Sequence, residues 1–380
     1  MDRRSFLATG ASGIAAVTFA PHLAFAAAAT DRRFLFVIQR GAADGLAILA
    51  PTGDPGFAGL RPQLGAEAAN GTKLDAMFTL HPALKQVAAM TAAKQALLVH
   101  AVASPYRDRS HFDGQNVLET GGALPYRMRD GWMNRLVRTM PDNPQAIAFA
   151  PTVPPALRGS ARVASYAPSN LPAAGEDLMI RVGDLYANDA QLGPLWNEAL
   201  QARTKAGDLA TGRGAVAAGA LAARMMKGPG GARIGMVETD GWDTHTAQRG
   251  RLNAQLTGLD AVLAAFRDGL GEDWNNTLVL VATEFGRTAR ENGTGGTDHG
   301  TGSTAFLLGG AVAGGKVVAD WPGLAPTALY EARDLKPTIN LDALIATALG
   351  QHFGQDPARM AQMLFPDTGS APLRQKLVLS

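Results

Sequence analysis

Continuous apolar runs that alternate with helical patterns constrain the fold of this chain more than any other feature. Residues 34–38, 96–102 and 277–281 are apolar almost throughout, which is typical of strands buried on both faces of a sheet. Between residues 252 and 270, leucines and a phenylalanine recur at spacings of three and four, which predicts a long amphipathic helix. Strands that alternate with helices favour a three-layer α/β/α sandwich around a largely parallel sheet.

Other segments fit the same alternation. Shorter strands are expected at 233–237 and 306–308, and short apolar runs occur at 146–150 and 161–166. Further helices are expected from Leu80–Leu84 onward and at 110–120, 192–209, 215–227 and 341–353. The sequence has no internal repeat, coiled coil or obvious linker. Residues 27–380 are therefore expected to form one domain with loop insertions.

Composition excludes several classes of function. The chain has 380 residues and a formal net charge of +2, so charge implies no nucleic-acid partner. It contains no cysteine, which excludes disulfides, thiolate metal ligands and a cysteine nucleophile. Any site must therefore use histidine, carboxylate or hydroxyl side chains.

The N-terminus has the pattern of an export signal. Arg3 and Arg4 precede a mild apolar stretch over residues 8–20 and then the small-x-small sequence Ala24-Phe25-Ala26. A membrane anchor is the alternative, but the stretch is short and rich in Ala, Gly and Thr, so no stable membrane span is expected after cleavage. Residues 1–26 are predicted to be a twin-arginine signal, which places the mature protein in the periplasm or outside the cell. That pathway carries folded proteins, which suits a metal loaded before export.

Acidic and histidine side chains follow the predicted strands. In open α/β sheets, ligands bind beyond the carboxyl ends of the strands, so residues placed there are candidates for one site. Carboxylates and neutral imidazoles are the ligands of Zn²⁺, Mn²⁺, Mg²⁺ and Ca²⁺, and the sequence does not decide among these ions. The predicted ligand pool is Asp44, His111, Asp240, Asp243, His245, Glu284, Asp298 and His299.

Each candidate also has a structural interpretation. Asp44 and Asp240 precede glycines and are also typical of turns. Glu284 is equally a partner for Arg287. His81, His100 and His352 lie beside apolar residues and are expected to be structural, and His22 belongs to the predicted signal.

Ser110 is the candidate nucleophile. It lies at the predicted start of a helix, where backbone amides stabilise negative charge, although serine is also a favoured N-cap. Arg107, Arg109 and Arg287 are candidate clamps for phosphate or sulfate oxygens, because a guanidinium pairs bidentately with them.

Four motifs in this order resemble the bacterial family known as domain of unknown function 1501. They are Arg109-Ser110-His111-Phe112-Asp113, Thr239-Asp240-Gly241-Trp242-Asp243-Thr244-His245, Thr283-Glu284-Phe285-Gly286-Arg287-Thr288 and Gly296-Thr297-Asp298-His299-Gly300. That family is thought to be similar to the alkaline phosphatase and sulfatase superfamily. The resemblance implies a three-layer sandwich, one or two metal ions and a Ser or Thr nucleophile at a helix start.

The resemblance also assigns positions and shows departures. Asp240 and His245 look like the superfamily's spaced metal pair, and Asp44 like its acid after the first strand. The turn that holds Asp44 reads Gly-Ala-Ala-Asp-Gly, where Gly-Gly-Asn-Asp-Gly is expected. Glu284 stands where an Asp is expected, and the last metal-binding His of phosphatases has no clear counterpart.

The leading hypothesis is an exported, metal-dependent hydrolase of phosphate or sulfate esters that acts on a small anionic ester. Ser110 would be the nucleophile, activated by the metal, and Arg287 would stabilise the transferred group. The alternative is a secreted metal-binding or assembly protein that keeps the fold and performs no chemistry. A metallopeptidase ranks lowest, because the chain lacks a His-Glu-x-x-His motif.

Overall fold

The computed structural model describes residues 30–140, 146–168 and 175–379. The predicted export signal, residues 1–26, lies outside the described residues. Within the described ranges, no helix combines the length and apolar character that crossing a bilayer requires.

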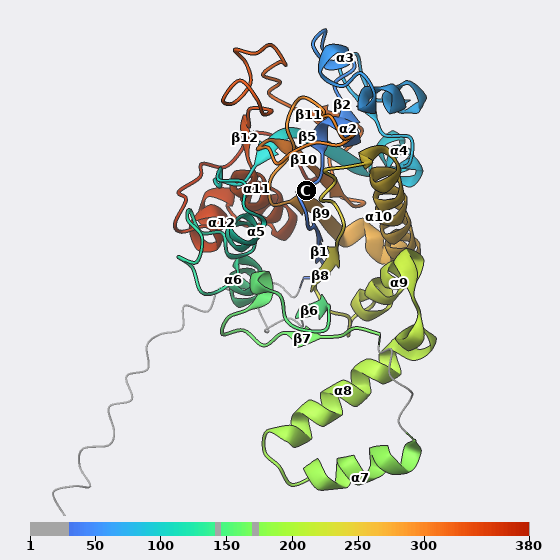
Figure 1. The fold of residues 1–380 in the computed structure, drawn as a ribbon. Coiled ribbons are helices and arrows are strands. Elements are labelled where there is room, and N and C mark those ends of the chain that lie inside the picture. The colour runs from blue at the N-terminus through green and yellow to red at the C-terminus, as the bar shows by residue number, and fades with distance from the viewer. Residues whose placement is uncertain (1–29, 141–145, 169–174, 380) are drawn as a thin grey trace, which may run out of the picture.

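A nine-stranded mixed sheet forms the centre of the molecule (Figure 1). Its path runs β11 (Lys316–Val318), β5 (Ala96–Ala103), β10 (Ser303–Leu308), β9 (Thr277–Thr283), β1 (Arg33–Gln39), β8 (Ile234–Thr239), β6 (Ala146–Phe149) and β7 (Ala164–Ser165), and β12 (Ile339–Asn340) also pairs with β5. All pairings between these strands are parallel except the two made by β10. The expectation of a largely parallel sheet is therefore confirmed.

Helices cover both faces of the sheet (Figure 1). Alternate residues of β1 point to opposite sides: Phe34 and Phe36 join one buried cluster, and Leu35 and Val37 join the other. The first cluster contains side chains of α5 (His111–Thr120), α6 (Trp132–Thr139), α11 (Leu341–Phe353) and α12 (Pro357–Leu364), and the second those of α4 (Lys85–Ala92), α9 (Gly214–Met226) and α10 (Gln248–Leu270). These layers are the predicted α/β/α sandwich.

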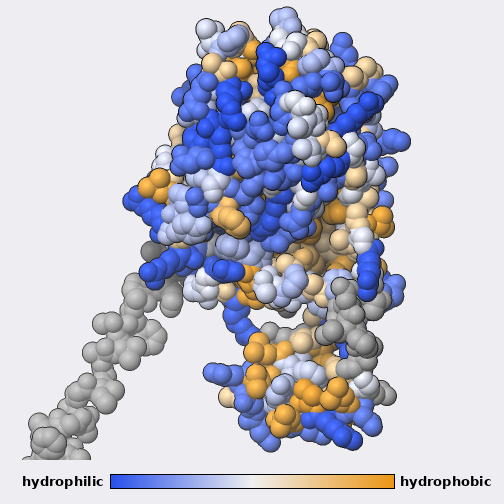
Figure 2. Space-filling view, viewed as in Figure 1, coloured by the Kyte–Doolittle hydropathy of each residue, from blue (hydrophilic) through white to orange (hydrophobic). Residues whose placement is uncertain are grey.

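Two peripheral parts complete the described fold. The pair α7 (Glu176–Tyr186) and α8 (Leu192–Ala206) extends away from the layers, and Figure 2 shows apolar residues gathered on it. The remaining short elements are α2 (Gly45–Ile48), α3 (Phe57–Leu60), the small sheet of β2 (Leu49–Ala50), β3 (Thr72–Lys73) and β4 (Thr79–Leu80), and the 3₁₀ turns η1 (Leu64–Asn70), η2 (Pro155–Leu157), η3 (Gly207–Thr211) and η4 (Gly271–Asn276).

The helix expected to open within Leu80–Leu84 is present, but it begins only after that segment. Leu80 ends strand β4, and α4 begins only at Lys85. Pro82 disfavours helical geometry at His81, and the imidazole of His81 accepts a hydrogen bond from the amide of Ala83, which forms a turn. The apolar run at 161–166 likewise gives only the two-residue strand β7.

The polar clusters gather at one edge of the sheet. Strands β1, β5, β8 and β9 are parallel, so their carboxyl ends face the same edge. Strand β10 runs the opposite way, and the glycine-rich loop before Ser303 therefore enters the sheet at that same edge. Segments far apart in the sequence meet there.

Candidate metal centre

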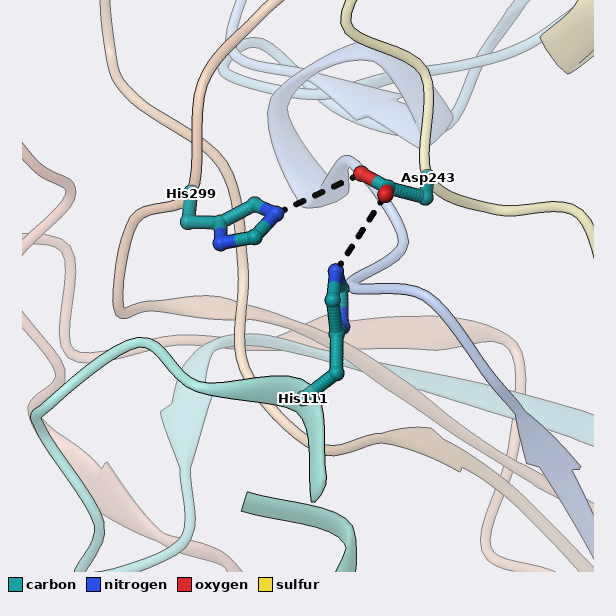
Figure 3. A group of neighbouring side chains, drawn as sticks. All are labelled: His111, Asp243 and His299. Atoms are coloured by element: carbon teal, nitrogen blue, oxygen red, sulfur yellow. Dashed lines mark hydrogen bonds and ion pairs between the residues drawn. The ribbon is translucent and has the colours of Figure 1, made fainter. Parts of the chain in front are cut away.

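Three side chains from three separate segments of the chain converge (Figure 3). His111 begins α5, Asp243 follows β8, and His299 precedes β10. One ligand atom from each residue lies within 4.8 Å of those of the other two. The Nε2 atom of His111 is 3.4 Å from Oδ2 of Asp243, and Nε2 of His299 is 3.4 Å from Oδ1 of the same carboxylate.

His245 adds a fourth group. Its Nε2 atom lies 3.0 Å from Nε2 of His299 and 3.0 Å from Oδ1 of Asp243. Three imidazoles and one carboxylate thus direct nitrogen and oxygen atoms toward one another.

The outer nitrogen of each histidine contacts an oxygen acceptor. Nδ1 of His111 lies 2.8 Å from Oε1 of Glu284, Nδ1 of His299 lies 2.9 Å from the carbonyl of Arg109, and Nδ1 of His245 lies 3.2 Å from Oδ1 of Asp298. An ionised carboxylate or a carbonyl only accepts hydrogen bonds, so we infer that each Nδ1 carries the hydrogen. The hydrogen bond to Glu284 raises the pKa of His111 above its usual value, and in the neutral form that a metal requires each Nε2 presents a lone pair to the centre.

These inward-facing nitrogen and oxygen atoms are arranged as ligands of a cation. Nε2 of His111 is buried and has no hydrogen-bond partner in the part of the chain that the structure describes. The Nε2 atoms of His245 and His299 lie 3.0 Å apart beside the carboxylate of Asp243, and the guanidinium of Arg287 is the positive charge that contacts this group. A divalent ion fits this donor set, and imidazole nitrogens favour a transition metal such as Zn²⁺ over Mg²⁺ or Ca²⁺.

Glu284 holds His111 from behind. Its carboxylate is fully buried, and its Oε1 atom accepts from the amide of Gly41 at 2.8 Å and from Nε2 of Gln115 at 3.1 Å, besides His111. Burial by itself disfavours the ionised form, but the hydrogen bonds, led by that from His111, hold the pKa of Glu284 below its usual value. The carboxylate that sequence alone offered as a ligand is therefore placed to orient a ligand.

Arg287 holds Asp243. Burial opposes ionisation of Asp243, yet the hydrogen bond and charge of Arg287 keep the pKa of this carboxyl below its usual value. The guanidinium is buried, and it also contacts Nε2 of His245 at 3.5 Å and donates to the backbone carbonyls of Gly41, Ala42, Trp242 and Thr297. Its donors are thus committed within the protein, and it is not turned toward an incoming anion.

Asp44 and Asp240 do not join the group. Asp44 is buried in a bidentate pair with Arg61, whose nitrogens lie 2.6 and 3.1 Å from the two carboxylate oxygens, and it also accepts from Gln248. Asp240 is exposed, and its side chain has no hydrogen bond or ion pair among the described residues. Asp298 is placed behind His245, much as Glu284 is placed behind His111.

Ser110 immediately precedes α5, as the sequence predicted. Its hydroxyl makes no capping hydrogen bond to the helix, so capping does not account for the residue. The guanidinium of Arg107 donates to the carbonyls of Ser104 and Tyr106, and that of Arg109 pairs with Asp334 and Glu331. Arg109 is thus held by two carboxylates, whereas Arg107 uses only its Nη1 atom.

Strained backbone accompanies the site. Ala42, Arg109 and Ala247 have φ values of 59°, 62° and 48°, in the left-handed region that residues other than glycine rarely adopt. Such residues cost about 1–3 kcal/mol each and cluster at functional sites. The glycines around Asp298 and His299 permit close approach, as expected: a Cβ at Gly300 would come within 2.3 Å of the backbone of Arg287.

Sequence reasoning missed several supporting residues. Gln115 lies four residues after His111 and so shares its face of α5, which helical periodicity alone indicates. Arg61 and the carbonyl of Arg109 carry no such signal, because their partners are distant in the chain.

Residues 178–364 match the family described as protein of unknown function DUF1501. The DUF1501 region contains Asp243, His245, Glu284 and His299, whereas His111 lies before it. A comparison with curated proteins gives no match.

Among solved structures, the chain is similar to a protein in the alkaline phosphatase superfamily from Vibrio parahaemolyticus. The identity is 12%, the TM-score is 0.42, and the alignment covers 92% of this chain and 72% of the other. It is also similar to a phosphonate monoester hydrolase of Agrobacterium radiobacter, at 11% identity and a TM-score of 0.33, with 76% and 70% of the two chains covered. Neither likeness is close enough to transfer a site or a reaction.

Proposed function

We propose that this protein is a metal-dependent hydrolase of phosphate or sulfate esters. In this proposal His111, Asp243 and His299 hold a divalent metal ion, and His245 is the fourth ligand. The observation that carries the proposal is the convergence of three imidazole Nε2 atoms on one carboxylate, with each Nδ1 already engaged by an oxygen. This orientation is characteristic of metal-ligating histidines.

The bound ion would polarise the ester and lower the pKa of an attacking hydroxyl. Ser110 is the proposed nucleophile, because it adjoins His111 and its hydroxyl is not used as a helix cap. Ser110 also stands at the N-terminus of α5, where unpaired backbone amides favour negative charge. Arg287 keeps Asp243 ionised and oriented, so its proposed role changes from anion clamp to positioning residue.

A second candidate is a secreted metal-binding protein without activity. The observation that favours it is that Arg109 and Arg287 are bound to protein acceptors through more than one nitrogen each, so neither is arranged to hold a transferred anion. Both candidates require the same metal, so only turnover separates them.

Turnover of aryl esters tests the proposed reaction. The mature chain, loaded with Zn²⁺ or Mn²⁺, is expected to hydrolyse 4-nitrophenyl phosphate or 4-nitrophenyl sulfate. Ser110→Ala should lower kcat at least about a hundredfold while metal content stays unchanged. Stoichiometric metal without turnover selects the second candidate, and turnover unaffected by both Ser110→Ala and His299→Ala overturns the mechanism.

We also propose export through the twin-arginine pathway, with cleavage after Ala26. The mass of the N-terminal peptide from periplasmic protein tests this. Exchange of Arg3 and Arg4 for lysine is expected to retain the precursor in the cytoplasm, and undiminished export of that variant would contradict the proposal.

A further inference from the structure

A pocket of about 560 Å³ opens beside the candidate metal centre, with Asp298 in its wall. This volume is within the range of small-molecule sites. Leu60, Leu324 and Leu329 supply apolar lining, and Arg290 and Arg333 supply charge. Asp298 contacts Nδ1 of His245, so only the imidazole ring of His245 separates this part of the pocket wall from the proposed ligand atom Nε2.

Each of the two acids of the lining accepts from two protein groups, whereas each of the two arginine side chains makes one hydrogen bond among the described residues. Glu291 accepts hydrogen bonds from the backbone amides of Gln63 and Leu64, and Asp298 accepts from His245 and Asn292. Arg290, by contrast, makes one long contact of 3.5 Å to the carbonyl of Gly59.

Arg333 pairs through Nη1 alone with Asp334, at 3.0 Å. Both guanidinium groups are on exposed residues and retain donors for a ligand. The pocket is therefore suited to an anion.

A tight turn presents Arg333. Tyr330 and Asp334 bridge its two sides, and the intervening Glu331 and Ala332 both have a φ of 52°. Two consecutive left-handed residues other than glycine are costly, so the surrounding contacts must hold this turn in place. Arg109 anchors this turn through Asp334, while its own carbonyl accepts from His299. One residue thus joins the pocket wall to the metal centre.

We propose that this pocket binds an organic anion, with an apolar body against Leu60, Leu324 and Leu329 and a phosphate, sulfate or carboxylate group at Arg290 and Arg333. That this anion is the substrate of the enzyme rests on the proposed function. The binding of the anion does not, because none of these five side chains is a proposed metal ligand.

Phenylphosphonate tests the pocket, since it carries a phenyl body and an anionic group and is not an ester. Titration calorimetry on the full chain, as purified and after EDTA treatment, should give saturable binding at one site in both states. Benzyl alcohol, which has no charge, should bind at least about tenfold more weakly. The double variant Arg290→Gln/Arg333→Gln should lose at least about tenfold in affinity, whereas Arg251→Gln, an exposed arginine of α10 outside the pocket, should not.

A filling variant gives an independent arm. Gly59 lines the pocket, and a Cβ added there would meet no atom within 4 Å, so Gly59→Phe should occupy the pocket while the chain still folds. It is expected to abolish phenylphosphonate binding and leave the unfolding midpoint unchanged.

The outcomes separate the two proposals. Absence of binding, binding removed by EDTA, or binding insensitive to both Gly59→Phe and the double arginine variant overturns the pocket. Binding with the predicted sensitivities, in a protein that takes up no metal or turns over no ester, supports the pocket and overturns the hydrolase.

Discussion

At the scale of single residues, the partner of each outer nitrogen decides what a histidine can do. Seven histidines occur in the chain, and three of them turn Nε2 toward Asp243. His100 and His352 instead bond backbone carbonyls through Nε2 and are buried, which agrees with the structural roles expected for them. The sequence predicted which residue types could form a site, but not which nitrogen each histidine would present.

Glu284→Gln should therefore weaken metal binding without removing a ligand. The amide is a poorer acceptor for Nδ1 of His111, and loss of such a partner typically costs about 10–100-fold in metal affinity. Competition titration with a zinc chelator measures the change. Glu238→Gln is the matched control, because Glu238 lies in β8 and pairs with Arg40 outside the group. Equal affinities for wild type and Glu284→Gln would contradict the orienting role.

At the scale of elements, strands and their ends were predictable and several helices were not. Apolar runs located β1, β5 and β9, because strands buried on both faces carry a continuous signal. The antiparallel direction of β10 could not be predicted, because a short apolar run does not indicate in which direction a strand runs within the sheet. α6 and α7 were also missed. Polar residues interrupt the apolar pattern of α6, and α7 packs mainly on α8 and leaves apolar side chains exposed.

The sequence offered Asp44, in the loop after β1, as a metal ligand. In the structure Asp44 is paired with the buried Arg61, which indicates a role in stability. Asp44→Ala should destabilise the fold by about 3–5 kcal/mol, because it leaves the buried guanidinium of Arg61 without its carboxylate. Urea unfolding measures this loss, and the double variant Asp44→Ala/Arg61→Met should recover much of it. Metal affinity is expected to stay within about threefold of wild type. A variant that folds with full stability but no longer binds metal would return Asp44 to the ligand set.

At the scale of the whole molecule, the buried ionisable groups pull stability in opposite directions with pH. Burial raises the pKa of Asp342 to about 7, and one of its carboxyl oxygens has no hydrogen-bond partner among the described residues. Burial likewise lowers the pKa of His100 and of His352 to about 4. Because of the two histidines, the protein loses stability as the pH falls from about 6.5 to 4. Because of Asp342, it loses stability as the pH rises from about 4 to 7.

Asp342→Asn isolates one of these effects. Asp342 has a pKa near 3.8 in the unfolded chain, so between about pH 4 and 7 the folded protein binds one more proton than the unfolded chain. The free energy of unfolding of the wild type therefore falls as the pH rises through this range. The variant should therefore gain on wild type across that window, by up to about 4 kcal/mol at pH 8. Urea unfolding at pH 5 and pH 8 gives the difference. A gain that does not change between the two pH values would contradict a protonated Asp342.

Zinc titration of the mature chain tests the central claim, that His111, Asp243 and His299 hold a metal ion. The account predicts one tightly bound Zn²⁺ per chain in the wild type and in Asp240→Asn. It predicts an affinity at least about a hundredfold lower in His299→Ala, with all three proteins retaining the same unfolding midpoint after EDTA treatment. Undiminished zinc binding by a folded His299→Ala variant, or no stoichiometric binding by the wild type, would contradict it.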